Sequence, residues 1–349
     1  MLFIKNRYIL YLLSFILMFF IGCEEKKLQP VKYNFEFICA TFGKGVYKTE
    51  TCGDSWYYLN AEQRGIEAYY KKLYQHPLKK DLVFIAVSRK GLFSIDLKTL
   101  QVNSNLAQYK NITSLLFKNN SNNNAEIFFS CEEKGVFKTK DDFSEIVELN
   151  DGLIYRDVQI LALYNNSIWA GTTNDIFKLS NDKWITLSNG IKNKNIYSIG
   201  GDKKNKIFFV GSGPYSGIKG RFEKIPCFYK SMDDGMSWSA SDKGIENGSL
   251  IYSIALHPQS PERIYIGTST GIYQSLNSGS SWKKMKNGLS DDIRIVDIKF
   301  RKMEDGKYLV FAAGSNGIYV SFDEDEPIWQ KKDYGLDKSI VTSMLFMGL

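Results

Sequence analysis

The stretch that decides the fold is FYKSMDDGMSWSASDKGI, residues 228–245. It holds Ser231, Asp233, Gly235 and Trp238 in the order S-x-D-x-G-x-x-W. The residues that lead into it have the aromatic, alternating character of a strand. The Asp and the Gly favour a tight turn, because an aspartate side chain accepts backbone N–H bonds and glycine adopts dihedral angles that other residues avoid. The tryptophan begins the return strand, so the stretch predicts a β-hairpin with a structural clasp.

Variants of this motif recur along the chain. Ser275, Asn277, Gly279 and Trp282 repeat it with Asn in the place of Asp. Partial copies contain Thr49 with Gly53 and Trp56, Thr139 with Asp141, Trp184 alone, and Ser321 with Asp323 and Trp329. The series resembles the Asp-box, the bacterial neuraminidase repeat. The resemblance implies that the eight residues of the two best copies are structural, and that the repeated tryptophans pack rather than bind sugar.

A second signal is a row of short hydrophobic segments, most of them preceded by glycine. The row begins at Gly45, Gly91, Gly135, Asp175, Cys227, Gly271 and Gly317. Seven copies at a period of about 45 residues predict the four-stranded blades of a β-propeller. An apolar strand that ends in small residues precedes each copy, and small side chains there allow neighbouring blades to approach one another. One strand earlier lies an apolar run that we expect to be the innermost strand of each blade.

The two ends of the repeat region complement one another. Residues 339–347, SIVTSMLFM, have the pattern of an innermost strand with no blade after it, whereas residues 35–59 supply three strands without an innermost one. Pairing the N- and C-terminal strands completes the seventh blade and removes exposed sheet edges. We therefore expect residues 34–349 to form a single all-β domain, a seven-bladed β-propeller closed by its terminal strands.

The N-terminus predicts an address outside the cytoplasm. Lys5 and Arg7 precede an apolar run that ends in Gly22-Cys23. This pattern predicts a lipoprotein signal peptide over residues 1–22, a lipid on Cys23 and a polar tether over residues 23–33. A simple transmembrane anchor is the alternative, because the apolar run is nearly long enough to span a bilayer. We expect a protein of the cell envelope, at the outer membrane if the cell is Gram-negative.

Composition argues against several classes of partner and cofactor. The 349 residues carry a formal net charge of +7, but Lys and Arg are scattered rather than grouped, so nucleic-acid binding is not indicated. Cys39, Cys52, Cys131 and Cys227 have no C-x-x-C spacing and no nearby His pair, which argues against a metal site. We expect free, mostly buried thiols and no cofactor. His76 and His257 each precede a proline and are predicted to be turn residues.

The strand order of a blade predicts where a binding site lies. Connections between blades share one face, the connection face, with the loops between second and third strands, and the Asp-box turns lie on the opposite face. The long loop 212–226 belongs to the connection face. The candidate binding residues of this face are Arg64, Arg156, Asp157, Tyr215, Arg221, Asp291 and Arg294. Asp157 with Asp291 or Asp292 could supply an acid/base pair.

Residues 251–289 look like the repeat shared by sortilin-type propellers, photosystem II assembly-factor propellers and xyloglucanases. The resemblance implies the fold, but propellers carry many functions. One hypothesis is a membrane-anchored lipoprotein that acts as a binding or assembly scaffold for a protein or a glycan through the connection face. The alternative is a carbohydrate-active enzyme, a glycoside hydrolase or lyase, that uses carboxylates at the channel mouth. Xyloglucanases of this type use one Asp from each of two propellers, so the resemblance implies that one propeller supplies half of that arrangement.

Overall fold

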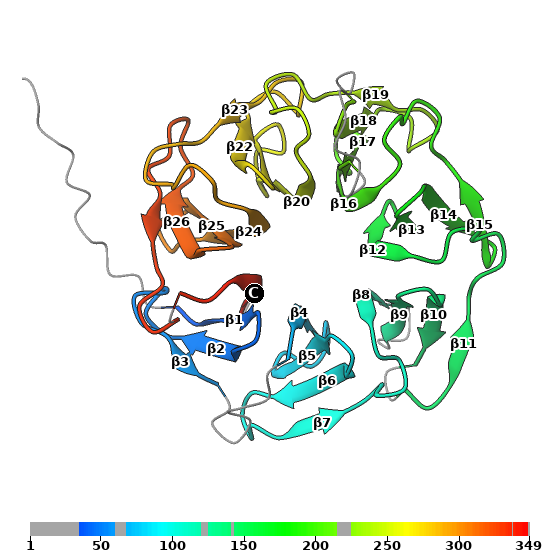
Figure 1. The fold of residues 1–349 in the computed structure, drawn as a ribbon, viewed down its shortest axis with the longest axis horizontal. Coiled ribbons are helices and arrows are strands. Elements are labelled where there is room, and N and C mark those ends of the chain that lie inside the picture. Colours follow the sequence, from blue (N-terminus) through cyan, green and yellow to red (C-terminus); the bar gives the residue numbers. More distant parts are fainter. Residues whose placement is uncertain are drawn as a thin grey trace, which may run out of the picture. The chain divides into compact units, whose positions relative to one another are not determined.

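One antiparallel four-stranded unit, repeated seven times, builds the molecule (Figure 1). The computed structural model describes residues 35–59, 68–119, 125–140, 143–214, 225–336 and 338–347. These residues belong to one compact unit, and every regular element in the described ranges is a β-strand. The seven sheets form a closed ring in which each blade presents one edge strand to the centre. The predicted all-β, seven-bladed propeller is confirmed.

We number the blades in chain order and give their strands from the inside outwards. Blade 1 is β4 (Tyr70–Gln75), β5 (Leu82–Val87), β6 (Gly91–Asp96) and β7 (Val102–Ser104); blade 2 is β8 (Ile112–Asn119), β9 (Ala125–Cys131), β10 (Gly135–Thr139) and β11 (Ile146–Glu148); blade 3 is β12 (Val158–Tyr164), β13 (Ser167–Thr172), β14 (Ile176–Ser180) and β15 (Lys183–Thr186). Blade 4 is β16 (Ile196–Asp202), β17 (Ile207–Ser212), β18 (Phe228–Ser231) and β19 (Ser239–Ala240); blade 5 is β20 (Ile251–Leu256), β21 (Ile264–Thr268), β22 (Gly271–Ser275) and β23 (Lys283–Lys284). Blade 6 is β24 (Ile295–Lys302), β25 (Tyr308–Gly314), β26 (Gly317–Phe322) and β27 (Gln330–Lys331); blade 7 is β28 (Val341–Phe346), β1 (Phe37–Thr41), β2 (Gly45–Thr49) and β3 (Tyr57–Tyr58).

The ring closes in blade 7, where strands from both ends of the chain share one sheet. β28 pairs antiparallel with β1, with Phe346 opposite Phe37 and Met344 opposite Cys39. In Figure 1 the red C-terminal strand lies inside the blue N-terminal strands of the same blade. This is the predicted closure by the terminal strands, and it leaves no inner edge unpaired at the join.

The apolar core is divided among the seams between consecutive blades. At the seam between blades 3 and 4, Trp169 and Trp238 pack on Phe208, with ring centroids 4.8 Å and 5.2 Å away. The small residues predicted near the inner strands have the expected role. A Cβ on Gly171 would lie 2.6 Å from the side chain of Ile196 in the next blade, a distance that real side chains do not tolerate. Glycine therefore permits the close approach of blades 3 and 4.

Polar side chains join the innermost strands of neighbouring blades around the channel. The backbone N–H of Leu161 donates to Ser114 Oγ at 3.0 Å, and that of Leu73 donates to Ser343 Oγ at 3.2 Å. In blade 6 a carboxylate takes the same place, and Asp297 Oδ2 accepts the N–H of Met344 at 2.8 Å. Because the inner edge of each strand has no further strand to pair with, these side chains satisfy edge groups that would otherwise lack a partner.

The two best Asp-box turns have the predicted hairpin geometry. Ser231 Oγ accepts the N–H of Gly235 at 2.9 Å, and Asp233 Oδ1 accepts the N–H of Ser237 at 2.9 Å. Hydrogen bonds from Ser237, above all, lower the pKa of Asp233 to about 2. Ser275 and Asn277 make the matching bonds to Gly279 and Ser281, each at 2.9 Å. The turn therefore needs an oxygen acceptor at this position rather than a charge.

The repeated tryptophans join each blade to the one before it. The indole Nε1 of Trp56 donates to Lys332 O at 3.0 Å, that of Trp184 to Leu149 O at 2.7 Å, that of Trp238 to Leu187 O at 2.8 Å, and that of Trp282 to Ser241 O at 2.8 Å. These four and Trp329 are all buried. Their interpretation as packing residues is confirmed.

The predictions for cysteine and histidine also agree with the structure. Cys39, Cys52, Cys131 and Cys227 are free and buried, and burial raises the pKa of the Cys52 thiol to about 12. His257 Nδ1 accepts the N–H groups of its own turn, at 3.2 Å from Gln259 N and 2.9 Å from Ser260 N. His76 Nδ1 accepts the equivalent bonds in blade 1. Both imidazoles are therefore turn residues, as the His-Pro sequence predicts.

Candidate functional site

All seven innermost strands carry a register irregularity next to their first paired residue, at the end that lies on the connection face. The register skips one residue in each strand, and each skipped residue is partly exposed. These residues are Lys71, Thr113, Gln159, Tyr197, Tyr252, Val296 and Thr342. A bulge re-aims a side chain away from the regular pleat. The bulges therefore form a ring of seven positions at the mouth of the central channel, which we call the mouth ring.

Aromatic side chains are concentrated at and beside this ring. Tyr197 of blade 4 and Tyr252 of blade 5 pack edge to face, with ring centroids 5.8 Å apart. Phe42, which follows β1, packs on Tyr69, which precedes β4, at 4.6 Å. Phe42 is 53% exposed and Tyr69 is 42% exposed. Large aromatic rings that stay accessible at one place are a common mark of a binding surface.

Arg294 adds a cation to the aromatic side chains. It precedes β24, and its backbone is fixed by reciprocal bonds with Ser315, 3.1 Å to Ser315 Oγ and 2.9 Å from Ser315 N. Burial raises the pKa of Tyr252, while the positive charge of Arg294, and to a lesser degree a hydrogen bond from its side chain, oppose that rise. Tyr69 also lies near enough to contribute to the same pKa. Tyr69, Tyr252 and Arg294 therefore belong to one local electrostatic environment.

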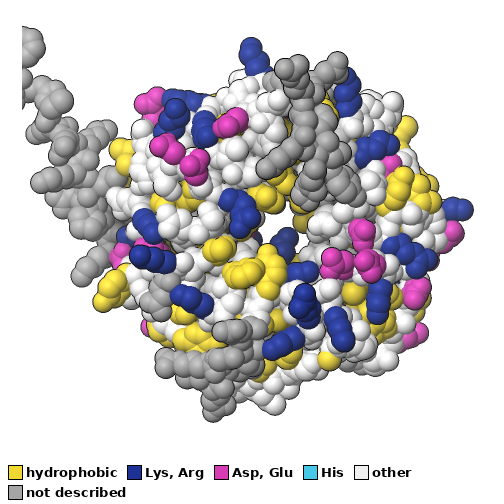
Figure 2. Space-filling view, viewed as in Figure 1, with side chains coloured by type: hydrophobic (Ala, Val, Ile, Leu, Met, Phe, Trp, Pro, Cys, Tyr) yellow, Lys and Arg dark blue, Asp and Glu magenta, His cyan; other side chains and the backbone are white. Residues whose placement is uncertain are grey.

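Lysines of the innermost strands add further positive charge beside the channel. Burial lowers the pKa of Lys71, against the opposing influence of Glu132, and burial lowers the pKa of Lys72, against that of Asp297. Lys299 Nζ lies 3.9 Å from Asp297 Oδ1. On the face drawn in Figure 2, Lys and Arg side chains and hydrophobic side chains lie together around the central opening. The mouth combines cations with aromatic rings and suits a ligand that carries both anionic and apolar groups.

The charged residues predicted from the sequence do not converge on one point. Arg156 is exposed, and Asp157 Oδ1 accepts the backbone N–H of Glu133 at 3.0 Å, so Asp157 caps a loop of blade 2. Asp291 and Asp292 lie in an exposed turn before β24. Blades 4 and 5 separate them from Asp157, and no hydrogen bond or ion pair in the described ranges joins the carboxylates. The arrangement does not favour a paired-carboxylate centre.

Other predicted positions lie outside the described residues. These are Arg64, Tyr215, Arg221 and Cys23. Of the predicted binding residues, only Arg294 has a described contact with the aromatic side chains of the mouth. The sequence does carry a signal for Tyr197 and Tyr252. They occupy the same place in the segments IYSI at 196–199 and 251–254.

A buried polar cluster at the seam between blades 5 and 6 was not expected from the sequence. Asp323 Oδ2 lies 3.3 Å from His257 Nε2, and Asp323 Oδ1 accepts from the Tyr265 hydroxyl at 2.9 Å. Arg263 Nη1 lies 3.5 Å from the same carboxylate. Burial raises the pKa of Asp323 and lowers that of His257, against their mutual attraction. Asp323 occupies an Asp-box position, but it bonds to the preceding blade instead of its own turn.

This cluster resembles catalytic machinery in composition only. His257 is 8% exposed, and the ring of Tyr308 packs against it at 4.4 Å. Both ring nitrogens are in use, since Nδ1 accepts turn amides and the N–H at Nε2 faces the Asp323 carboxylate. A buried, bonded His–Asp pair with no access to ligand joins two blades rather than moving a proton in a reaction.

No group of three or more His, Cys, Asp or Glu side chains in the described ranges could hold a metal ion. Within the same ranges, no helix has the length and apolar character needed to cross a membrane.

Comparison with characterised proteins supports the fold. A xyloglucanase of Hypocrea jecorina (strain QM6a) is 27% identical over 127 residues, which are 32% of this chain and 14% of that protein. The chain therefore corresponds to a small part of this relative. No protein-family model matches the chain.

Solved structures with the same fold have several different functions. A GH74 enzyme of Niastella koreensis superposes with a TM-score of 0.65 at 13% identity, covering 87% of this chain and 55% of that one. The extracellular domain of a B. thetaiotaomicron hybrid two-component system gives 0.60 at 19% identity, covering 80% and 36%. YCF48 bound to D1 peptide gives 0.54 at 11% identity, covering 82% and 92%. At these identities the likeness establishes the propeller fold alone.

Proposed function

We propose that this protein is an extracytoplasmic, membrane-anchored scaffold that binds a protein or a glycan partner through the connection face. The observation that carries the proposal is the aromatic and cationic mouth, with Phe42 and Tyr69 exposed beside Tyr252 and Arg294. A binding surface needs accessible rings and fixed charges, and the mouth offers both. A glycosidase needs two carboxylates on either side of one bond; here Asp157 is engaged by the backbone of Glu133, which supports the binding role over the enzyme alternative.

The comparisons support a binding role without assigning a partner. One solved neighbour is named as an extracellular domain of a signalling protein, and another is named as bound to a peptide. Both use the fold found here, so a propeller of this type can serve recognition without catalysis. The enzyme alternative, a carbohydrate-active hydrolase or lyase, draws support only from the GH74 neighbours and the short xyloglucanase match.

The anchoring part of the proposal rests on the N-terminal sequence. A signal peptide over residues 1–22, a lipid on Cys23 and a tether over residues 23–33 would hold the propeller of residues 34–349 at the cell envelope. Arg64, Arg156, Asp157, Tyr215, Arg221, Asp291 and Arg294 remain the proposed polar contributors to the connection face. In a Gram-negative cell the proposed destination is the outer membrane.

The test is affinity capture from native membranes with matched variants of the full-length chain. Tyr69→Ala and Arg294→Ala remove a ring and a cation from the mouth. Met232→Ser is the control, because Met232 is 62% exposed in an Asp-box turn on the opposite face. We expect a partner that the wild type and Met232→Ser recover in equal amounts and that both mouth variants recover at a much lower level.

A glycan array run with the same four proteins distinguishes the two classes of partner. A glycan signal that the mouth variants lose would identify a carbohydrate ligand of the same surface. Capture that is insensitive to both mouth variants but lost in Met232→Ser would place the interface on the Asp-box face and would overturn the proposal.

A further inference from the structure

The seam between blades 7 and 1 is one of two seams that lack the repeated tryptophan. Five seams contain a buried tryptophan from the outermost-strand region of the later blade, namely Trp56, Trp184, Trp238, Trp282 and Trp329. Strand register identifies the equivalent residue in blade 1. In blade 3, Thr186 pairs with Phe177, and Trp184, two residues earlier in the same strand, pairs with Leu179. In blade 1, Ser104 pairs with Phe93, and Val102, two residues earlier, pairs with Ile95. Val102 therefore occupies the tryptophan position of blade 1.

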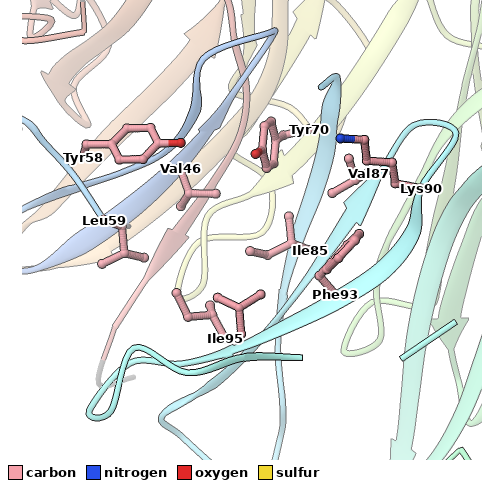
Figure 3. A pocket seen from close by; sticks show the side chains of 10 residues that line it. Val46, Tyr58, Leu59, Tyr70, Ile85, Val87, Lys90, Phe93 and Ile95 are labelled. Atoms are coloured by element: carbon pink, nitrogen blue, oxygen red, sulfur yellow. The ribbon is translucent and has the colours of Figure 1, made fainter. Parts of the chain in front are cut away.

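An apolar cavity of about 90 Å³ lies at this seam. Val46 and Leu59 line it from blade 7, and Ile85, Phe93, Ile95 and Val102 line it from blade 1. Figure 3 shows the side chains of the two blades facing each other across the space. The second seam without a tryptophan, between blades 1 and 2, differs because Phe143 packs there against Phe84, with ring centroids 5.6 Å apart.

The occupied seams show what such a cavity accepts. In each of four seams a carbonyl at the end of the earlier blade accepts the indole N–H, for example Leu149 O from Trp184 and Leu187 O from Trp238. Leu59 is the equivalent residue of blade 7, because its N–H donates to Val46 O as that of Leu149 donates to Val136 O. The seam between blades 7 and 1 thus repeats both the apolar walls and the position of the acceptor residue.

A wider cleft lies beside the cavity at Leu59 and offers space for a polypeptide. It has a volume of about 510 Å³, shares Leu59 with the cavity, and is lined by Lys48, Tyr57, Lys98 and Leu100 among others. Tyr57 is 45% exposed and Leu100 is 46% exposed. An extended segment in this cleft could place one side chain in the cavity, as the outermost strand does in the other seams.

We propose that the cavity between blades 7 and 1 is a second binding site, separate from the mouth ring, that takes a tryptophan side chain of a partner protein. The indole fills the position that Val102 leaves open, and its N–H donates to the carbonyl of Leu59. The wider cleft holds the flanking residues of the same segment. A dry, apolar cavity of about 150 Å³ binds benzene. The cavity here, at about 90 Å³, is smaller and has an open side, so it is suited to one edge of an indole while the rest of the ring lies at the opening.

The test measures binding of N-acetyl-tryptophanamide to the full-length chain by ligand-observed NMR, with N-acetyl-leucinamide as the comparison ligand. Val102→Trp fills the cavity from within, as the repeat does elsewhere. We expect saturable binding of the tryptophan derivative to the wild type and an affinity at least tenfold lower for Val102→Trp. The variant should unfold at a midpoint temperature no lower than that of the wild type. If the indole of Val102→Trp prevents folding, Val102→Phe fills the cavity with a smaller ring and takes its place.

Ile146→Val is the matched control, because Ile146 holds the same register position in blade 2, at a seam that Phe143 already fills. It should leave binding unchanged. Equal affinity of the wild type and Val102→Trp, or no saturable binding to the wild type, would overturn the proposal. Equal binding of N-acetyl-leucinamide would overturn the preference for an aromatic ring. Tighter binding of free indole than of N-acetyl-tryptophanamide would overturn the assignment to a partner protein in favour of a small aromatic molecule.

Discussion

The indole hydrogen bonds between blades make a prediction that compares two tryptophans of one repeat position. Trp238 is 6% exposed and its Nε1 donates to Leu187 O at 2.8 Å. Trp329 is 2% exposed, and its Nε1 is buried with no hydrogen-bond partner in the described part of the chain. Trp238→Phe and Trp329→Phe remove a similar volume from similar apolar surroundings. Only Trp238→Phe also breaks a hydrogen bond and leaves a carbonyl without its donor.

The size of the difference follows from the cost of that bond. Replacing each indole by a smaller ring leaves a comparable cavity, so this part of the cost cancels in the comparison. The lost hydrogen bond adds about 0.5–1.5 kcal/mol for Trp238→Phe, and more if the Leu187 carbonyl stays dry. With the midpoint shift of about 2–4 °C per kcal/mol that is typical of chains of about 150–250 residues, Trp238→Phe should melt about 1–6 °C below Trp329→Phe.

Differential scanning calorimetry of the two variants and the wild type measures this difference directly. A lower midpoint for Trp238→Phe than for Trp329→Phe is the expected result. Equal midpoints, or a lower one for Trp329→Phe, would refute the claim that the indole hydrogen bond holds neighbouring blades together.

Four further predictions concern closure, pH, the Asp-box and the anchor. Deleting residues 341–349 removes β28 and should abolish cooperative unfolding in calorimetry, whereas deleting residues 348–349 alone should not. The pKa of His257 is lowered, chiefly by burial, so the protein should lose stability as the pH falls below 6.5. The melting temperature of His257→Gln should depend less on pH in that range than the melting temperature of the wild type. The pKa of Asp233 is lowered to about 2, so the stability that its carboxylate contributes is present above pH 3.8 and is lost as the pH falls towards 2. Asp233→Asn should keep the turn, because Asn277 makes the same bonds in blade 5. The melting temperature of Asp233→Asn should therefore fall less than that of the wild type between pH 3.8 and 2. Cys23→Ser should abolish labelling with radioactive palmitate and release the protein from the membrane fraction; unchanged labelling would contradict the lipoprotein assignment.

The fold was predictable because its signals are local and repeated. Alternating apolar residues mark the strands, and the row from Gly45 to Gly317 gives their period. The complementary ends at residues 35–59 and 339–347 imply ring closure, since each lacks what the other supplies. Packing then follows from the repeat, and the same tryptophan position is buried in five blades.

The site was harder to predict because it depends on register and on contacts between distant blades. The mouth ring exists because each inner strand skips one residue, and such a bulge is set by pairing with the next strand rather than by the inner strand alone. Asp157 has the charge of a catalytic residue, but the backbone of Glu133 uses it as a cap. Asp323 looks like a weak Asp-box residue, yet it bonds to His257 and Tyr265 of another blade. Residue type alone carries no information on these partners.

The most direct test of the proposed function is site-specific photo-crosslinking in native membranes. p-Benzoylphenylalanine replaces Phe42 at the mouth in one protein and Met236 in an Asp-box turn in another, since both side chains are largely exposed, at 53% and 65%. The proposal predicts a discrete adduct from position 42 that is absent from position 236 and that disappears when Arg294→Ala is added. An adduct from position 236 alone would contradict recognition through the connection face, and an adduct from position 42 that persists with Arg294→Ala would contradict the role of Arg294 in it.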